Sequence, residues 1–205
     1  MGQLKVIKGG AISLLEDLGR FGYQNMGLTT GGSMDEHASR WANRLLNNAA
    51  DCVVLEVTLG NVELLAESDC VISLCGADMP IHINGKAVMN WSTHRVLQGD
   101  YITLGWAKEG MRSYLAVKGG FQIAPEFGSV STVVRESLGG LNGQPLTSGN
   151  LLPFIDEQQP DKSQMNKMVP WYSKPDYSTV PTLRVIAGYQ FEHFSSEDID
   201  RFFSS

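Results

Sequence analysis

The residues best suited to chemistry lie between positions 17 and 48, in two glycine turns that precede a helix. The first turn begins at Asp17 and carries Arg20, and the second contains Gly31 and Gly32 and leads into Asp35. Backbone N–H groups are free at the start of a helix and open to a ligand at glycine turns. This region could therefore bind an anion or a polar group of a substrate.

Arg20 and Asp35 are the first two candidates for catalysis in this region. The planar guanidinium of Arg20 suits two oxygens of one carboxylate, and the glycines beside it let a ligand approach the backbone. The alternative for Arg20 is a salt bridge to Asp17 or Asp35 that only fixes the loop. Asp35 could accept an N–H of an amide or ureido group, or it could simply cap the helix.

The start of the helix indicates which kind of ligand this region accepts. Ser33 and Glu36 form an S-x-x-E capping box, which predicts Ser33 as the N-cap and a helix that begins near Met34. Asp35 and Glu36 also place two negative charges in the first turn, where they would repel a phosphate. The sequence therefore favours a ligand that donates N–H groups, with Arg20 left to bind any carboxylate.

Four further residues could contribute to a site. Glu56 is a polar residue in an otherwise apolar strand segment, so it is either a buried ion-pair partner or a third catalytic group. Ser131 and Thr132 could donate to a substrate carbonyl, although hydroxyls in glycine-rich loops commonly bond their own backbone. Arg135, in the same loop, is a second cation that could bind substrate.

Composition restricts the class of protein. The chain has 205 residues, a net charge of -6 and 42% hydrophobic residues, which is typical of a globular protein without a nucleic-acid partner. The sequence contains neither an apolar N-terminal segment nor a run of eighteen apolar residues, so we expect a cytoplasmic protein without membrane contact. Cys52, Cys70 and Cys75 lack the spacing of a metal site, and no metal is expected.

Hydrophobic periodicity predicts a mainly β protein with one prominent helix. Ala38, Trp41, Ala42 and Leu45 recur at helical spacing. From residue 51 to 118 the period changes to two, and short alternating segments are separated by turns such as the hairpin signal at 84–85. Many short strands with tight turns indicate an antiparallel barrel or sandwich.

The end of the chain differs from the rest. Residues 156–181 are polar and contain four prolines, which is typical of a linker between a domain at 1–155 and a following segment at 182–205. In that last segment we expect a strand at 183–187 and a helix capped by Ser195. This segment would be the truncated start of a second half.

A series of short motifs follows one another in a fixed order along the chain. They are D-x-G-R-x-G at 17–22, G-x-M-D at 32–35, A-x-R-x-A-N at 38–43, LEVTLG at 55–60, CGAD at 75–78, RSYLAVKGG at 112–120, and GSVST at 128–132 before GGL at 139–141. In this order the motifs resemble those of the allophanate hydrolase subunit 2 or KipA family, which includes the C-type subunit of 5-oxoprolinase and part of the carboxyltransferase domain of urea carboxylase. The resemblance covers essentially the whole chain.

The resemblance implies a cyclophilin-like antiparallel β-barrel and an assembly with two partners, an A-type protein and a B-type (KipI-like) protein. That assembly would open 5-oxoproline to glutamate with ATP. Because the chain has no P-loop motif, ATP would be bound with the help of a partner. One alternative is a carboxyltransferase component that works with biotin on a partner. In both cases the substrate is a small cyclic amide or ureido compound.

A second alternative is a non-catalytic KipA-like protein that binds and antagonises a KipI-like kinase inhibitor. Three departures from the family pattern favour it. Val133 and Asn150 stand where the family has aspartates, and Gln144 stands where it has an arginine.

Overall fold

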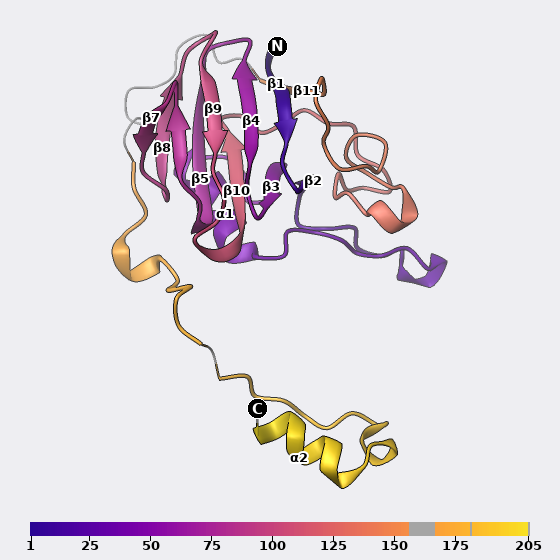
Figure 1. Ribbon diagram of the computed structural model, residues 1–205. Helices are drawn as coiled ribbons and strands as arrows, with labels where there is room; N and C mark the ends of the chain where they lie inside the picture. Colours follow the sequence, from indigo (N-terminus) through magenta and orange to yellow (C-terminus); the bar gives the residue numbers. More distant parts are fainter. Residues whose placement is uncertain (156–166, 181, 205) are drawn as a thin grey trace.

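Two antiparallel sheets that share one core form the body of the protein (Figure 1). The computed structural model describes residues 1–155, 167–180 and 182–204. The first sheet has the order β11 (Leu151–Phe154), β1 (Gly2–Gly9), β4 (Val62–Ala66), β9 (Tyr101–Leu104), β6 (Ile81–Ile83) and β7 (Lys86–Val88). The second has the order β2 (Ile12–Glu16), β3 (Val54–Thr58), β10 (Glu109–Val117), β5 (Cys70–Asp78) and β8 (Ser92–Val96). The predicted mainly β antiparallel architecture is confirmed.

The second sheet is buried on both faces. Leu55 and Leu115 point into the core between the sheets. Their neighbours Val54, Tyr114 and Ala116 point the other way and lie in a separate apolar cluster under the helix α1 (Glu36–Leu45). Successive side chains of a strand lie on opposite faces, so the central strands of this sheet are apolar at nearly every position.

The amphipathic pattern at 38–45 predicted α1 correctly. Ala38, Ala42 and Leu45 are buried on the face that packs against the second sheet, while Arg40 is exposed and pairs with Glu36 one turn earlier. The hairpin signal is confirmed as well. Ile83 pairs with Lys86, and both residues of the intervening turn, at 84–85, have positive φ as a type I′ turn requires.

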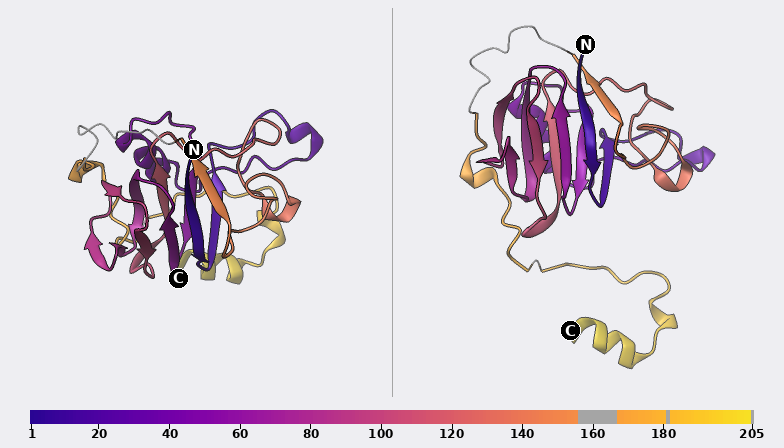
Figure 2. Two further views of the ribbon diagram at one scale, coloured as in Figure 1. Left: turned by 90° about the horizontal axis from the view of Figure 1, so that it is seen from above. Right: turned by 45° about the horizontal axis from the view of Figure 1, so that its top comes forward.

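Two long loops extend from the body beside β2, an edge strand of the second sheet (Figures 1 and 2). One connects β2 to α1 and contains the 3-10 helix η1 (Gln24–Met26). The other connects β10 to β11 and contains the 3-10 helix η2 (Val134–Glu136). The candidate residues for chemistry lie on these loops and on the strands next to them.

Residues 167–180, which fall in the predicted linker, pack against the body. Val169 is buried and its N–H donates to the carbonyl of Trp91 (2.9 Å). The 3-10 helix η4 (Trp171–Ser173) follows, and the Ser173 carbonyl lies 2.8 Å from Nε2 of His37 on α1. The rest of the predicted linker, 156–166 and 181, lies outside the described residues.

The last described segment, 182–204, lies away from the sheets (Figure 1). The strand expected at 183–187 is absent there, because these residues extend into solvent without a strand to pair with. The 3-10 helix η5 (Phe191–His193) precedes α2 (Ser196–Ser204), whose predicted cap is confirmed by a bond from Asp198 N–H to Ser195 Oγ (3.2 Å). Among the described residues, every helix is too short or too polar to cross a membrane.

Candidate functional site

Asp17 is the centre of a polar cluster that joins the two long loops. Its Oδ1 accepts from Gly19 N–H (2.8 Å) and from the hydroxyls of Ser129 and Ser131 (2.7 Å each), and its Oδ2 accepts from Val130 N–H (2.6 Å). Burial alone would raise the pKa of Asp17, but these hydrogen bonds outweigh it and lower the pKa below its ordinary value. Asp17 therefore holds the glycine turn at 19–22 against the loop at 129–131.

Arg20 is buried in the same cluster, with 1% of its surface exposed. Its Nε donates to the carbonyl of Glu126 (2.9 Å), and its Nη2 donates to the carbonyls of Ser129 (3.3 Å) and Ser131 (3.2 Å). The salt bridge to Asp17 or Asp35 that the sequence suggested is not formed, and Arg20 makes no ion pair with any described residue. This guanidinium fixes a loop through backbone carbonyls, and its Nη1 is buried without a hydrogen-bond partner among the described residues.

Ser131 and Thr132 lie beside the second glycine turn, but their hydroxyls bond to this chain. Ser131 donates to Asp17, and Thr132 Oγ1 donates to the carbonyl of Leu15 on β2 (2.8 Å). The space around them is tight. A methyl group at Gly139 would lie 2.1 Å from the Ser131 carbonyl oxygen.

Gly31 and Gly32 form the turn that faces these hydroxyls. A side chain at Gly31 would meet Ser131 and Val133 at 3.1 and 3.2 Å. Gly32 has a φ of +99°, and a side chain there would lie 2.9 Å from the carbonyl oxygen of Leu18. The two predicted binding glycines are therefore also required by the packing of the three segments.

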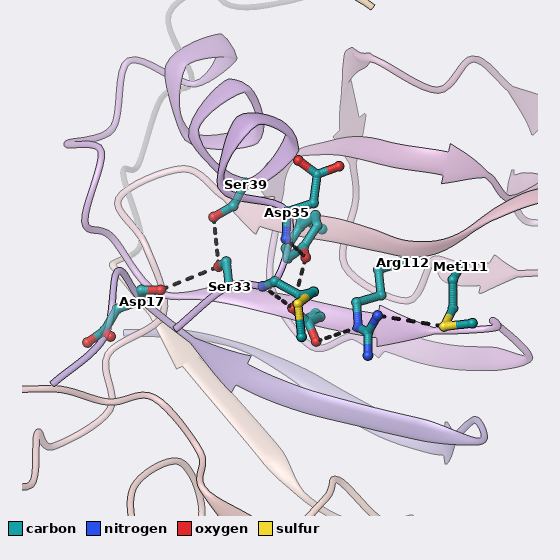
Figure 3. A network of polar contacts seen from close by, with 9 residues as sticks. Asp17, Ser33, Asp35, Ser39, Met111 and Arg112 are labelled. Atoms are coloured by element: carbon teal, nitrogen blue, oxygen red, sulfur yellow. Dashed lines mark hydrogen bonds and ion pairs between the residues drawn. The ribbon is translucent and has the colours of Figure 1, made fainter. Parts of the chain in front are cut away.

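The helix start differs from the prediction. Asp35, rather than Ser33, is the N-cap of α1, because its Oδ1 accepts from Ala38 N–H (3.0 Å). Ser33 is turned toward the body, where its hydroxyl donates to Ser39 (2.9 Å) and to the carbonyl of Asp17 (3.4 Å) (Figure 3). Glu36 bonds forward to Arg40 instead of back to Ser33. The capping-box pattern thus identified the helix correctly but placed its start two residues early.

Asp35 has both carboxylate oxygens in use. While Oδ1 caps the helix, Oδ2 accepts from the hydroxyl of Tyr177 (2.8 Å) in the segment 167–180. Burial, followed by this contact with Asp35, raises the pKa of Tyr177. Asp35 therefore joins α1 to the segment at 167–180, which favours the capping alternative over an open acceptor for substrate.

Glu56 is the centre of a second polar network, and Figure 3 shows two of the residues that this network joins, Asp35 and Arg112. Its Oε1 accepts from Arg112 Nε (3.2 Å) on β10, and its Oε2 accepts from Met34 N–H (3.0 Å) and the Tyr114 hydroxyl (2.8 Å). Tyr114 Oη in turn accepts from Asp35 N–H (2.7 Å). Burial raises the pKa of Tyr114, and the Glu56 charge adds to this effect. The structural ion pair anticipated for Glu56 is present, and it anchors the chain just before α1.

Arg135 lies at the tip of the second loop, and 81% of its side chain is exposed. Its Nη2 donates to Thr29 Oγ1 (3.0 Å) and Glu136 Oε1 (3.1 Å). Glu136 also accepts from the Thr29 N–H and hydroxyl, so the tips of the two loops touch.

Of the three departures from the family pattern, Asn150 caps a turn by accepting from Thr147 N–H (2.8 Å), a role that an aspartate would also fill.

Glu16, at the end of β2, is the residue that the sequence analysis missed. It is 3% exposed, and its Oε2 is buried without a partner among the described residues. Burial, followed by the charge of Glu56, raises the pKa of Glu16 from 4.5 to about 8, although the Ser131 hydroxyl and the Gly32 backbone act in the opposite direction. Its place in the short apolar segment ISLLE, immediately before Asp17, was the signal that could have identified it.

The chain matches known proteins over most of its length. Over 98% of the chain it is 32% identical to the C-type subunit of 5-oxoprolinase from Escherichia coli, and over 70% it is 36% identical to the protein of that name from Haemophilus influenzae. It is also 29% identical to urea amidolyase of Lachancea kluyveri. The chain spans 63%, 46% and 12% of the lengths of these relatives.

Solved structures agree with these relatives. The crystal structure of TTHA0988 superposes on the whole chain with a TM-score of 0.85 at 27% identity, and the chain covers 39% of that protein. Urea carboxylase of Kluyveromyces lactis matches 99% of the chain with a TM-score of 0.78 at 26% identity, over 19% of its own length. A family model described as carboxyltransferase domain, subdomain A and B, matches residues 26–205. The chain belongs to this carboxyltransferase-domain family.

Proposed function

We propose that this protein is the C-type component of an ATP-dependent 5-oxoprolinase assembly that opens 5-oxoproline to glutamate. The observation that carries this proposal is the match of 98% of the chain to a C-type 5-oxoprolinase subunit at 32% identity. Because that relative is one subunit of its enzyme, the activity in this proposal belongs to an assembly with A-type and B-type partners. The loops around Gly31 and Gly32 are the surface that receives the cyclic amide.

ATP is bound by a partner in this proposal, because the residues of this chain do not fit a triphosphate at the start of α1, beside the loops. The N–H groups of Met34, Asp35 and Ala38 donate to Glu56, Tyr114 and Asp35 respectively. Asp35 and Glu36 also place two negative charges at the start of α1, where they would repel a phosphate. The protein is cytoplasmic in the same proposal.

Reconstitution tests the proposal directly. The purified chain is mixed with its A-type and B-type partners, and glutamate and ADP are measured with 5-oxoproline and ATP present. We expect both products in equal amounts only when all three proteins are present. Glutamate formation without this chain, or none in the complete mixture, would contradict the proposal.

The second candidate is a component of a carboxyltransferase that works with biotin on a partner. The family description and the urea carboxylase structure favour it. Here Asp35 would need a free oxygen for the ureido group, and both of its oxygens are engaged. Titration calorimetry with a biotinylated carrier distinguishes the two candidates, since only the carboxyltransferase requires saturable binding. The non-catalytic KipA-like alternative requires a partner complex that is inactive with either substrate.

A further inference from the structure

The cluster beside the glycine turns contains one carboxyl group with an oxygen that accepts no hydrogen bond among the described residues. Asp17 accepts from four donors, Glu56 from three, and Asp35 from two. Glu16 Oε2 has no partner among the described residues, although it is buried. A buried polar atom without a partner costs about 1–3 kcal/mol, so such a group needs an explanation.

Register places Glu16 next to Glu56. Leu14 on β2 is opposite Glu56 on β3, and Glu16 is opposite Val54. Glu16 and Glu56 are therefore diagonal neighbours on the same face of the second sheet. Glu56 is neutralised by Arg112, whereas no ion pair reaches Glu16 among the described residues. Two carboxyl groups side by side in such different surroundings are typical of a site where one is charged and the other holds a proton.

The surroundings of Glu16 fit a group that exchanges a proton with a ligand. The groups that act on it are Glu56 from β3, Asp17 beside it, the Ser131 hydroxyl from the second loop, and the Gly32 backbone. None of these is a cation. The backbone of Gly32 contacts Glu16, and Gly31 and Gly32, which lack side chains, are exposed and half-buried respectively.

We propose that Glu16 is the proton-transfer residue of the site and gives its proton to the ring nitrogen of the cyclic amide. This inference rests on the proposed function. The C–N bond of the ring breaks and its nitrogen takes the Glu16 proton. The oxygen of one water molecule joins the carbonyl carbon, and a proton from that water restores Glu16. The partners' hydrolysis of ATP to ADP and phosphate drives the opening.

The test uses the complete reconstituted assembly with Glu16→Gln, which keeps the size of the side chain but cannot transfer the proton. We expect kcat to fall by about 100-fold or more, while the variant still assembles with its partners. The wild-type kcat should fall above about pH 8, and the residual kcat of the variant should not show this decrease. Glu63→Gln, the same change on β4, is the matched control and should behave as wild type.

The outcomes separate this inference from the proposed function. If the wild-type assembly makes no glutamate, both are wrong. If it does, and Glu16→Gln keeps the wild-type kcat and pH profile, only the role of Glu16 is wrong. If Glu16→Gln fails to assemble, Glu16→Asp serves instead. This variant retains an acid on a shorter side chain, so its kcat should be reduced but should still fall above pH 8. An unchanged kcat would overturn the proposal.

Discussion

Charged side chains in the loop cluster are neutralised mainly by dipoles of the chain. Asp17 is surrounded by hydroxyl and N–H donors, and Arg20 by backbone carbonyls. A buried charge is tolerated when hydrogen bonds replace the water it has lost. Each of these residues therefore stabilises the loops through the backbone and hydroxyl groups that it binds.

Arg20→Met should destabilise the protein strongly. The change removes the hydrogen bonds from Arg20 to the carbonyls of Glu126, Ser129 and Ser131, at a cost of about 3 kcal/mol or more in the free energy of unfolding. Urea denaturation measures this free energy. Arg135→Met is the matched control, because that side chain is 81% exposed and its loss should change stability by less than about 0.5 kcal/mol. Equal effects of the two changes would contradict the role given to Arg20.

Glu16 should make stability depend on pH. Because its pKa is raised from 4.5 to about 8 in the folded state, the native protein holds a proton that the unfolded chain has lost between these values. Its contribution to the free energy of unfolding therefore falls by about 1.4 kcal/mol per pH unit across this window and is level above it. Urea denaturation at several pH values measures this effect. The free energy of unfolding of Glu16→Gln should rise relative to that of the wild type from pH 5 to 8. A constant difference would contradict the raised pKa.

At the scale of elements, the position of α1 depends on contacts that its own sequence does not contain. Met34 and Asp35 donate their N–H groups to Glu56 and Tyr114 in the second sheet. These bonds hold the two residues before the helix in a non-helical conformation, so the first turn starts only at Glu36. The sheet thereby sets where the helix begins.

Asp35→Ala should cost about 0.5–2 kcal/mol through the lost cap, and the lost bond to Tyr177 should add to this. Asp35→Asn retains a capping oxygen and should cost less. Thermal unfolding of both variants measures the difference. Ser33→Ala provides the comparison, and a larger loss there than in Asp35→Ala would restore Ser33 as the cap.

The sequence predicted the elements whose pattern is local and not the contacts between distant segments. The α1 stripe and the alternation in β3, β4 and β10 follow from neighbouring residues. The role of Arg20 does not, because its partners lie more than 100 residues further along the chain. Glu16 was missed for the same reason. Its burial depends on the register of β2 with β3 and on the second loop, and neither is encoded in its neighbours.

At the scale of the whole molecule, the body and the last segment differ in how much they are packed. Residues 167–180 contribute a buried Val169 and the bond from Tyr177 to Asp35. Residues 182–204 leave apolar side chains such as Ile186 and Phe202 exposed to solvent. The division predicted at 155 is untested, and the contacts favour placing the end of the folded body near residue 180.

Two shortened chains test this boundary. A chain that ends at residue 180 should unfold with a free energy within about 0.5 kcal/mol of the full chain, because the removed side chains are exposed. A chain that ends at 166 should lose about 2 kcal/mol or more, since it removes the buried Val169 and leaves the Asp35 carboxylate with one partner fewer. Equal stability of the two shortened chains would place the boundary before residue 167 instead.

Asp17 binds hydroxyls that lie 112 and 114 residues away in the chain. Closing so long a segment costs conformational entropy, and the contacts that offset this cost form only when both sheets are in register. We therefore expect these bonds to form after the rate-limiting step of folding. Asp17→Asn should therefore accelerate unfolding in stopped-flow measurements and leave the folding rate nearly unchanged. The loop cluster is then the last part of the protein to form and the first to open, and the Asp17 carboxylate lengthens the time for which it stays closed.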